Sequence, residues 1–538
     1  MRALALLLLL TSGCVRAGWR PGDAAAALDG SDGAPVDGDG AGTPDGDGAP
    51  DGPAGPAYYI SPTGDDSNPG TRAAPWRSWS TAISRLVPGD TLVALDGTYA
   101  DTAANRLFID CDPASTTCDG APCPSGTAQA PITLRAERER MAHIPSGEYA
   151  SLRIDACRHW VIEGLHLSQS DTGTNGELQL VRLLDDDHVT LRRLLLEKPN
   201  RSRNSHGLLA SDCTFLLVEE CEVYDFHRYG MLINRGSDIV LRRNYINSRD
   251  RADLAGGYAS NDPTTGDSGI QLNATQRVTA ENNLVERARM GIKVETGGYP
   301  DTVVGGGDDN RLLGNVVRAA TTFAYSFDSN CLSQTPCDSS LNTVSNLEVR
   351  DCVAVGSAYN GFTGNGVEDA ALTNLTSADA AHNDYHFTLA TENSGMQSSV
   401  TLQSCLNFGA GGANGFLLES QASWSVDHCN SYGNTYNYDS MTNVTSSTDI
   451  DPQMGGCYLY VPAGSPMKGA GKGGGDIGAS VVLAYENGAQ TSRRLWDQTS
   501  GVFVGCGATV TGVNDATTQS CVTVHQRLHV GSGGCAIP

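Results

Sequence analysis

The chain of 538 residues contains few basic residues, and lysine is especially rare. Only four lysines occur, namely Lys198, Lys293, Lys468 and Lys472. Lysine and arginine together number 36 against 61 aspartate and glutamate, which gives a formal net charge of −25. Such a surface repels phosphate, so the composition disfavours a nucleic-acid partner. An acidic polysaccharide stays compatible, because a bound cation or local basic residues can reverse the sign of the local potential.

The sequence also lacks long apolar segments and recognisable metal motifs. The apolar run over residues 3–10 is too short to span a membrane. Few stretches show the apolar period of a helix, and 63 glycines further disfavour helix for the bulk of the chain. No paired CxxC zinc pattern occurs, and the Asp-Gly pairs near the N-terminus lack the glutamate that completes an EF-hand loop.

The N-terminus has the pattern of an export signal. Arg2 precedes the apolar run, which ends in Thr11, Ser12, Gly13 and Cys14. This ending resembles a bacterial lipobox with Cys14 as the lipidated residue, although Thr11 replaces the usual leucine; an ordinary signal peptide is the alternative. Residues 15–57 consist mainly of Asp, Gly, Ala and Pro and are predicted to form a flexible tether. We therefore expect an exported protein, either secreted or anchored to a membrane only through lipid.

Export allows disulfides, and the chain has sixteen cysteines. Without Cys14 fifteen are left, so at least one stays unpaired. Cys331 and Cys337 bracket a short loop and are candidates to close it, Cys111, Cys118 and Cys123 cluster in another loop, and Cys506, Cys521 and Cys535 lie in the C-terminal part of the sequence. Four others fall on a repeated turn position and are expected to be buried thiols: Cys221, Cys352, Cys405 and Cys429.

A short sequence motif occurs ten times along the chain: apolar residue, spacer, apolar residue, turn residue, then another apolar pair. Residues 161–165 and 239–246 are two copies. The turn positions are Gly164, Arg193, Cys221, Asn244, Asn283, Asn315, Cys352, Asn374, Cys405 and Cys429, and they are 22 to 39 residues apart. Strands joined by uneven loop insertions are the sequence pattern of a solenoid. At the turn column, Asn244, Asn283 and Asn315 are predicted to form a ladder of side-chain amides.

A glycine that leads into a strand forms a second column, at residues 207, 230, 269, 291, 361 and 415. Because side chains alternate along a strand, the residue after each glycine is predicted to point inward. These inward residues are Leu208, Met231, Ile270, Ile292, Phe362 and Phe416. The next residues should point outward and stack from coil to coil: Leu209, Leu232, Gln271, Lys293, Thr363 and Leu417.

The two ends of the repeat carry a resemblance to a known family. Residues 58–99, with Trp76, a short predicted helix over residues 80–86 and Asp96-Gly97-Thr98-Tyr99, resemble the N-terminal cap of secreted right-handed parallel β-helix proteins of the pectate-lyase-like group. Residues 451–479, ending in Asp476-Ile477-Gly478-Ala479, resemble the closing segment of such helices. The resemblance implies an all-β, right-handed parallel β-helix solenoid over residues 58–479, and it leaves residues 480–538 as a small Cys-containing extension of unknown role.

Lys293 is the one lysine predicted to lie in the middle of the solenoid at an outward strand position. Its predicted neighbours are Gln271, Arg289, Glu295, Ser326 and Asp328. Long acid-rich loops, residues 247–267 and 297–309, adjoin its strand, and inserted loops on one face are where a solenoid builds a binding groove. We predict Lys293 and Arg289 as catalytic residues. The substrate-binding candidates are His206, His227, Arg228, Tyr229 and Gln271. The candidate calcium ligands are Asp250, Asp253, Asp267, Glu295 and Asp328.

This inventory suits β-elimination on an acidic polysaccharide that contains uronate. Ca²⁺ held by carboxylates neutralises the uronate carboxylate, and a Lys or Arg whose pKa is lowered by desolvation or nearby cations takes the C5 proton. Lyases of the pectate-lyase-like group combine these features, so the resemblance implies the same chemistry.

Three other interpretations stay open from the sequence. Lys293 is alternatively a surface lysine paired with Glu295. Glu295 and Asp328 are also candidates for the paired carboxylates of a glycosidase. Because no family-specific catalytic string is present, a non-catalytic surface lipoprotein that binds glycan or has a structural, adhesive role is the alternative to an enzyme. We expect a monomer in either case.

Overall fold

The computed structural model describes residues 56–100, 102, 105–147, 149–169, 179–197, 205–226, 228–248, 268–296, 307–329, 343–388, 399–409, 412–419, 423–439, 441 and 443–495. Cys14 and most of the predicted tether lie outside this part of the chain, whereas Ala57, the last tether residue, already begins a strand. No helix in the described part is long and apolar enough to cross a membrane.

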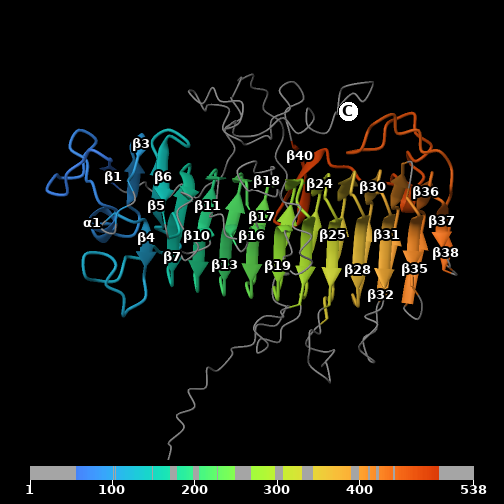
Figure 1. The fold of residues 1–538 in the computed structure, drawn as a ribbon, viewed down its shortest axis with the longest axis horizontal. Coiled ribbons are helices and arrows are strands. Elements are labelled where there is room, and N and C mark those ends of the chain that lie inside the picture. Colours follow the sequence, from blue (N-terminus) through green and yellow to red (C-terminus); the bar gives the residue numbers. More distant parts are fainter. Residues whose placement is uncertain are drawn as a thin grey trace, which may run out of the picture. The chain divides into compact units, whose positions relative to one another are not determined.

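Three long sheets form a solenoid in which each coil contributes one strand to each sheet (Figure 1). Every strand pairing that the structure describes within the three sheets is parallel. Sheet 1 contains, in order, β1 (Ala57–Ile60), β2 (Thr91–Ala94), β5 (Ile132–Ala136), β8 (Trp160–Glu163), β11 (Thr190–Arg192), β14 (Leu217–Glu219), β17 (Val240–Arg242), β20 (Thr279–Glu281), β23 (Arg311–Leu313), β26 (Glu348–Arg350), β29 (Ala370–Thr373), β32 (Ser399–Gln403), β35 (Ser423–Asp427) and β38 (Val444–Thr445).

Sheet 2 follows the glycine column and carries the predicted site. It contains β4 (Phe108–Asp110), β7 (Leu152–Asp155), β10 (Gln179–Leu184), β13 (His206–Ser211), β16 (Tyr229–Asn234), β19 (Ser268–Asn273), β22 (Met290–Glu295), β25 (Phe323–Asp328), β28 (Asn360–Asn365), β31 (Asn383–Thr388), β34 (Asn414–Leu418) and β37 (Tyr436–Asp439).

Sheet 3 lies between the other two in chain order. It contains β3 (Gly97–Thr98), β6 (Ala142–Ser146), β9 (His166–Gln169), β12 (Leu195–Glu197), β15 (Glu222–Tyr224), β18 (Tyr245–Asn247), β21 (Leu284–Glu286), β24 (Val316–Arg318), β27 (Val353–Val355), β30 (Thr376–Ala378), β33 (Leu406–Phe408) and β36 (Asn430–Tyr432). The predicted all-β solenoid is thereby confirmed.

Among the described residues, helix is confined to two short segments. The predicted N-terminal helix is present as α1 (Trp79–Ser84), which buries Trp79 against Tyr99 with ring centres 4.8 Å apart. A single 3₁₀ turn, η1 (Lys472–Gly474), lies near the other end. Two disulfides, Cys111–Cys157 and Cys118–Cys123, staple the first coils.

The corner between sheets 1 and 3 holds the predicted amide ladder. The Nδ2 group of Asn244 donates to Oδ1 of Asn283 over 3.0 Å, and Nδ2 of Asn283 donates to Oδ1 of Asn315 over 2.9 Å. The cysteines predicted on this column are buried free thiols: Cys221, Cys352, Cys405 and Cys429. A buried amide must find partners, and stacking places an identical group directly above and below it.

The turn column of the sequence is shifted by one residue in three coils. Gly164, Arg193 and Asn374 have left-handed backbone, with φ of 70°, 53° and 53°. The ladder position is the residue after each of them, because the carbonyls of Leu165, Leu194 and Leu375 accept the same coil-to-coil hydrogen bond as those of the ladder asparagines. The repeat in the sequence does not distinguish the two positions, since the residues at both are small or polar in most coils.

The inward residues predicted from the glycine column are buried, and several of their rings stack. Tyr325, Phe362, Tyr385 and Phe416 stand in one pile with adjacent ring centres 4.5, 5.2 and 4.6 Å apart. The glycine itself is required at the corner, because a Cβ on Gly291 would lie 2.3 Å from Cγ1 of Val317 and 2.5 Å from the carbonyl oxygen of Ala324.

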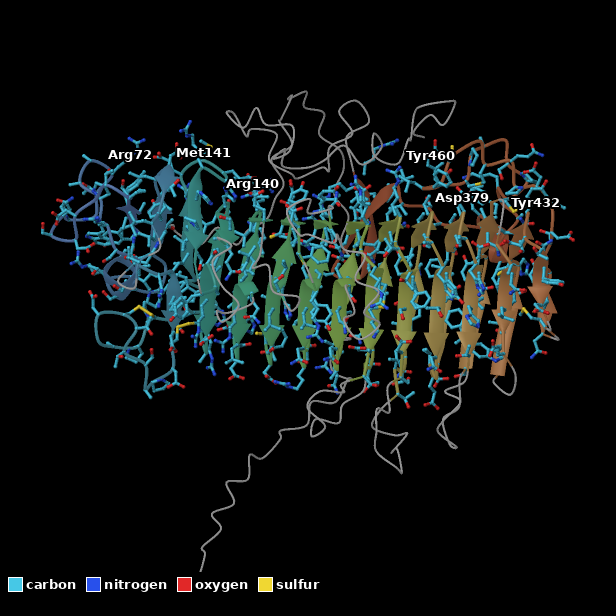
Figure 2. The ribbon with its side chains drawn as sticks, viewed as in Figure 1. Arg72, Arg140, Met141, Asp379, Tyr432 and Tyr460 are labelled. Atoms are coloured by element: carbon cyan, nitrogen blue, oxygen red, sulfur yellow. A yellow bond between two sulfur atoms is a disulfide. The ribbon has the colours of Figure 1, made fainter. Side chains whose placement is uncertain are left out.

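After β38 the chain turns back along sheet 3 instead of ending at the last coil. The backbone N–H of Gly478 donates to the Ser404 carbonyl, that of Ala479 to Thr376, and that of Tyr485 to Asn282, so successive contacts move toward the N-terminal coils. The hairpin β39 (Leu483–Glu486) and β40 (Ala489–Arg494) ends this return segment, which we define as residues 450–495. Figure 2 shows its residue Tyr460 on the same side as Asp379 of the coils.

We expect Gly291→Ala to destabilise the solenoid. The added methyl group has to displace Val317 and a backbone carbonyl, and overpacking of this kind costs about 1–3 kcal/mol of the free energy of unfolding. Urea denaturation measures the loss. The matched control is Gly464→Ala, where an added Cβ meets nothing within 4 Å and should leave the midpoint unchanged. Equal midpoints for the two variants would contradict the steric account.

Candidate functional site

The outward face of sheet 2 brings the predicted site residues together from three successive coils. In the strand register, Gln271 of β19 pairs with Lys293 of β22, which pairs with Ser326 of β25. Glu295 and Asp328 pair in the next outward column. These five residues, which we define as the Lys293 cluster, confirm the neighbours predicted from the repeat.

Lys293 lies at the centre of a continuous set of polar contacts. Its Nζ donates to Glu295 and lies 3.4 Å from Oδ2 of Asp328. The Gln271 amide also donates to Glu295, while Oε1 of Gln271 accepts from Ser268 over 2.8 Å. On the other side, the hydroxyl of Ser326 donates to Asp328 over 2.9 Å. The side chains of Lys293 and Glu295 are each only 14% exposed, so this ion pair is largely shielded from water.

The electrostatics of the cluster differ from the prediction. Burial alone would lower the pKa of Lys293, but the carboxylates of Glu295 and Asp328 outweigh it and raise that pKa above its ordinary value. The expected lowering of the lysine pKa is therefore wrong in this state of the protein. Lys293 is a charged ammonium at neutral pH, and it becomes a free amine only in alkaline solution or after its carboxylate partners are removed.

Tyr229 and Arg228 flank the cluster from the coil below β19. Tyr229 is 7% exposed, and burial raises the pKa of its hydroxyl, with a further contribution from Glu295. The guanidinium of Arg228 lies over the Tyr229 ring, 4.9 Å from its centre. The cationic group of Arg228 is thereby held against Tyr229, and its role in binding substrate stays a prediction.

His206 packs edge-on against Tyr229, with ring centres 4.9 Å apart. Burial, followed by the nearby charge of Arg228, lowers the pKa of His206 to about 3, so the imidazole is neutral at neutral pH. Neither ring nitrogen has a hydrogen-bond partner within the described part of the chain. A neutral, buried imidazole has no charge with which to attract a carboxylate.

Arg289 occupies the turn directly before β22 and is partly exposed. Further along the same edge of sheet 2, Tyr359 and His382 stack face to face, with ring centres 4.3 Å apart and an angle of 9°. Tyr359 is 42% exposed, so the pair presents an open aromatic surface two coils beyond Lys293. The sequence gave no reason to pair Tyr359 with His382.

The remaining predicted site residues lie outside the described part of the chain: His227, Asp250, Asp253 and Asp267. Of the predicted calcium ligands, only Glu295 and Asp328 are described, and both contact the Lys293 ammonium. No group of three or more His, Cys, Asp or Glu side chains in the described ranges is placed to hold a metal ion. Two carboxylates engaged with a lysine do not fit a Ca²⁺ ion, which takes six to eight oxygen ligands.

Residues 181–374, which include the whole Lys293 cluster, match the family model described as "Right handed beta helix region". The fold is a right-handed parallel β-helix. The handedness implied by the resemblance of the two ends is thereby confirmed.

Several solved structures are similar to this chain at low sequence identity. Pectate lyase Pel9A is 15% identical with a TM-score of 0.44, and the match covers 78% of this chain and 95% of that one. XylC in complex with xylose is 9% identical with a TM-score of 0.49, covering 74% and 87%. The mannuronan C-5 epimerase AlgE6 A-module of Azotobacter vinelandii is 12% identical with a TM-score of 0.47, covering 68% and 91%. At this identity the likeness concerns the fold alone. Comparison with curated proteins gave no match.

We predict that Glu295→Gln lowers the pKa of Lys293, because the closest negative charge is lost while burial continues to oppose the ammonium form. Asp328→Asn should lower it less, since that carboxylate is the more distant and more exposed of the two. The titration is measured by NMR on protein with isotope-labelled lysine, in which only four side chains contribute signals. An unchanged Lys293 titration in Glu295→Gln would contradict the ion-pair account.

Proposed function

We propose that this protein acts on a uronate-containing polysaccharide by β-elimination at the Lys293 cluster. The observation that supports the proposal is a shielded lysine on the outward face of sheet 2, held between two carboxylates and flanked by two arginines. Of the three lysines that the structure describes, Lys293 alone lies on a strand of the solenoid. Arg228 directly precedes β16 and Arg289 directly precedes β22, on the same edge of sheet 2.

In the proposed reaction the free amine of Lys293 takes the proton from C5 of the uronate. The electrons of the C5–H bond form the C4=C5 double bond, and the bond from C4 to the glycosidic oxygen breaks. The departing oxygen takes up a proton from water or from a neighbouring acid such as Tyr229. Arg289, at the start of the same strand, is proposed to pair with the uronate carboxylate, whose charge must be neutralised before C5 becomes acidic.

Calcium binding and an exported location are predictions from the sequence. The described residues do not form a calcium site by themselves, so no step of the reaction is assigned to the ion. Comparing activity with added calcium and with a chelator tests whether the acid-rich loops supply one. An exported location, with or without lipid at Cys14, fits a polymeric substrate that does not enter cells.

The charged state of Lys293 favours a second candidate, a non-catalytic glycan-binding surface. A lysine with a raised pKa is very rarely deprotonated at neutral pH, so it is a poor general base. Its positive charge makes it a good partner for an anionic sugar. The two candidates differ in turnover: the enzyme releases unsaturated uronates, whereas the binding protein retains the polymer unchanged.

The decisive assay incubates the protein with pectate, alginate and glycosaminoglycans, with and without calcium, and follows the absorbance of unsaturated uronate. We expect Lys293→Ala to lower kcat by about 10²-fold or more, the usual contribution of a general base. Lys468→Ala is the matched control, because that lysine is exposed in the return segment. Binding of a polymer without any unsaturated product would exclude the lyase and support the binding candidate.

The pH profile gives a further test of the role of Lys293. Only the deprotonated amine accepts a proton, so kcat/KM should rise with pH as Lys293 loses its proton. Since Glu295 and Asp328 raise that pKa, the rise should continue above the ordinary lysine range, and Asp328→Asn should move it to lower pH. A profile that Asp328→Asn leaves in place would assign the proton transfer to another group.

The Tyr359–His382 pair should bind a sugar residue away from the bond that is cleaved. Strands of adjacent coils are about 4.8 Å apart, so this pair lies roughly 10 Å along the solenoid from Lys293. We expect Tyr359→Ala to reduce kcat/KM on long chains by about tenfold and to leave the shortest cleaved oligosaccharides unaffected. Phe215→Ala, which removes an exposed ring (52%) at a corner before sheet 1, is the control. An equal loss on short and long substrates would show that the ring does not form a distant subsite.

A further inference from the structure

A pocket with no part in the proposed elimination lies where the return segment meets the last coils. It is lined by Phe408 at the end of β33 and Gly409 after it, by Tyr432 at the end of β36 and Gly433 after it, and by residues 451–456, and its volume is about 470 Å³. This volume is in the range of small-molecule sites. The pocket is on sheet 3, four coils beyond the coil of Lys293, so the two sites do not share a side chain.

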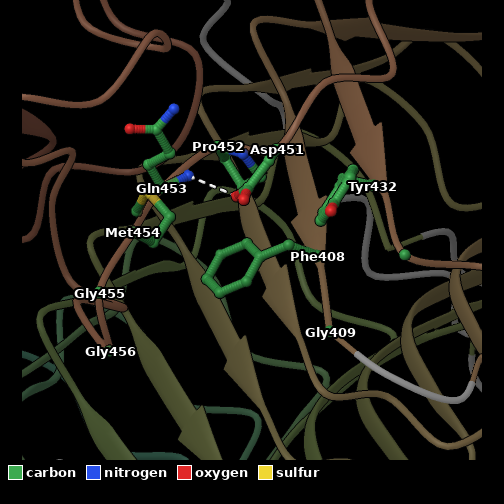
Figure 3. A pocket seen from close by; sticks show the side chains of 10 residues that line it. Phe408, Gly409, Tyr432, Asp451, Pro452, Gln453, Met454, Gly455 and Gly456 are labelled. Carbon is green, nitrogen blue, oxygen red and sulfur yellow. Dashed lines mark hydrogen bonds between the residues drawn. The ribbon is translucent and has the colours of Figure 1, made fainter.

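Two aromatic rings from adjacent coils form one side of the pocket. Phe408 and Tyr432 are register partners at the ends of their strands, and both point outward from sheet 3 (Figure 3). Tyr432 is 40% exposed. Behind Phe408, Tyr458 of the return segment stacks in parallel at 6.1 Å and holds the ring in place. The supported, half-buried ring of Phe408 and the exposed ring of Tyr432 beside it suit the C–H face of a sugar ring, which is apolar and flat.

The opposite side of the pocket supplies hydrogen-bonding groups. Oδ1 of Asp451 accepts from the backbone N–H of Gln453 over 2.8 Å, which fixes the carboxylate beside the two rings. Oδ2 of Asp451 has no partner among the described residues. Gln453 is exposed and has left-handed backbone with φ of 50°, a conformation that costs energy for a non-glycine residue. A carboxylate and an amide at the rim can bind neighbouring sugar hydroxyls.

The glycines keep the mouth of the pocket open. An added Cβ on Gly455 or Gly456 would meet nothing within 4 Å, so this stretch leaves its backbone accessible and adds no side chain to the opening. Met454 and Pro452, both buried, close the floor. The arrangement is an apolar floor and wall with polar groups only at the rim.

We propose that this pocket is a binding site for an uncharged sugar residue of a glycan. Asp451 is the one charged group among the ten lining residues, and it would repel a uronate, so the ligand differs in charge from the substrate proposed at Lys293. The site binds and does not cleave, because a glycosidase requires two facing carboxylates. It would hold a neutral stretch or neighbouring neutral polymer while the outward face of sheet 2 engages the acidic chain.

The test is titration calorimetry, with saturation-transfer NMR, on the full chain against neutral hexasaccharides of β-glucan, xylan and mannan and against hexauronates. We expect at least one neutral hexasaccharide to bind. Tyr432→Ala should weaken that binding about tenfold through loss of the stacking ring, and Asp451→Ala should weaken it as well. Tyr436→Ala, an exposed tyrosine (60%) outside the lining, and Lys293→Ala should both bind as the unchanged protein does.

Three results would overturn the proposal. One is that no neutral hexasaccharide binds, as would happen if another part of the chain filled the pocket. Another is binding of a neutral hexasaccharide that Tyr432→Ala leaves intact. Loss of that binding in Lys293→Ala would count in the same way, because it would place the sugar on sheet 2. The third is a preference for hexauronates that depends on Tyr432. Failure of the elimination assay leaves this proposal untouched, because Lys293 takes no part in it.

Discussion

The structure depends on coil-to-coil register at the corners. Each corner residue must offer the next coil the same backbone carbonyl, and its side chain must be satisfied by its own equivalents above and below. Asn244, Asn283 and Asn315 meet this demand by donating to one another, and the cysteines meet it by being small and apolar. A single slip of register would leave these amides buried without partners, at a cost of about 1–3 kcal/mol for each lost group.

Register at the corners is also what creates the chemical face. Once the corners are aligned, outward residues more than twenty positions apart in the chain become neighbours about 4.8 Å apart. Gln271, Lys293 and Ser326 meet in this way, and so do Glu295 and Asp328. The fold thus converts a column of the sequence into a row of side chains, and the properties of any one group are set by the coils on either side. The raised pKa of Lys293 is an example, since one of the two carboxylates responsible comes from the next coil.

The sequence predicted the columns well because they repeat. The glycine near the start of six strands of sheet 2, the inward rings and the neighbours of Lys293 all followed from spacing and alternation. The ladder position was off by one residue at Gly164, Arg193 and Asn374, because two adjacent corner positions share a preference for small or polar residues. Properties that depend on the balance between burial and neighbouring charges were not predictable. Spacing places a lysine near two carboxylates but does not say whether burial or charge decides its pKa.

Features formed by non-repeating segments could not be predicted from the sequence either. The pocket joins Phe408 and Tyr432 to residues 451–456, and no periodicity connects a coil with a segment that lies across it. The segment over residues 451–479 resembled a closing end, yet its contacts run sideways along sheet 3. The resemblance was carried by short turn motifs, which fix local conformation and say little about direction.

The course of residues 450–495 affects how the whole repeat array behaves. In a solenoid each unit contacts only its nearest neighbours, so units can fray one at a time from either end. Here Tyr485 is hydrogen-bonded to Asn282 and Asp351, while Gly478 is hydrogen-bonded to Ser404, so the return segment spans many coils. Local opening of a coil beneath the return segment would break contacts far from it. The return segment therefore couples units that would otherwise melt independently.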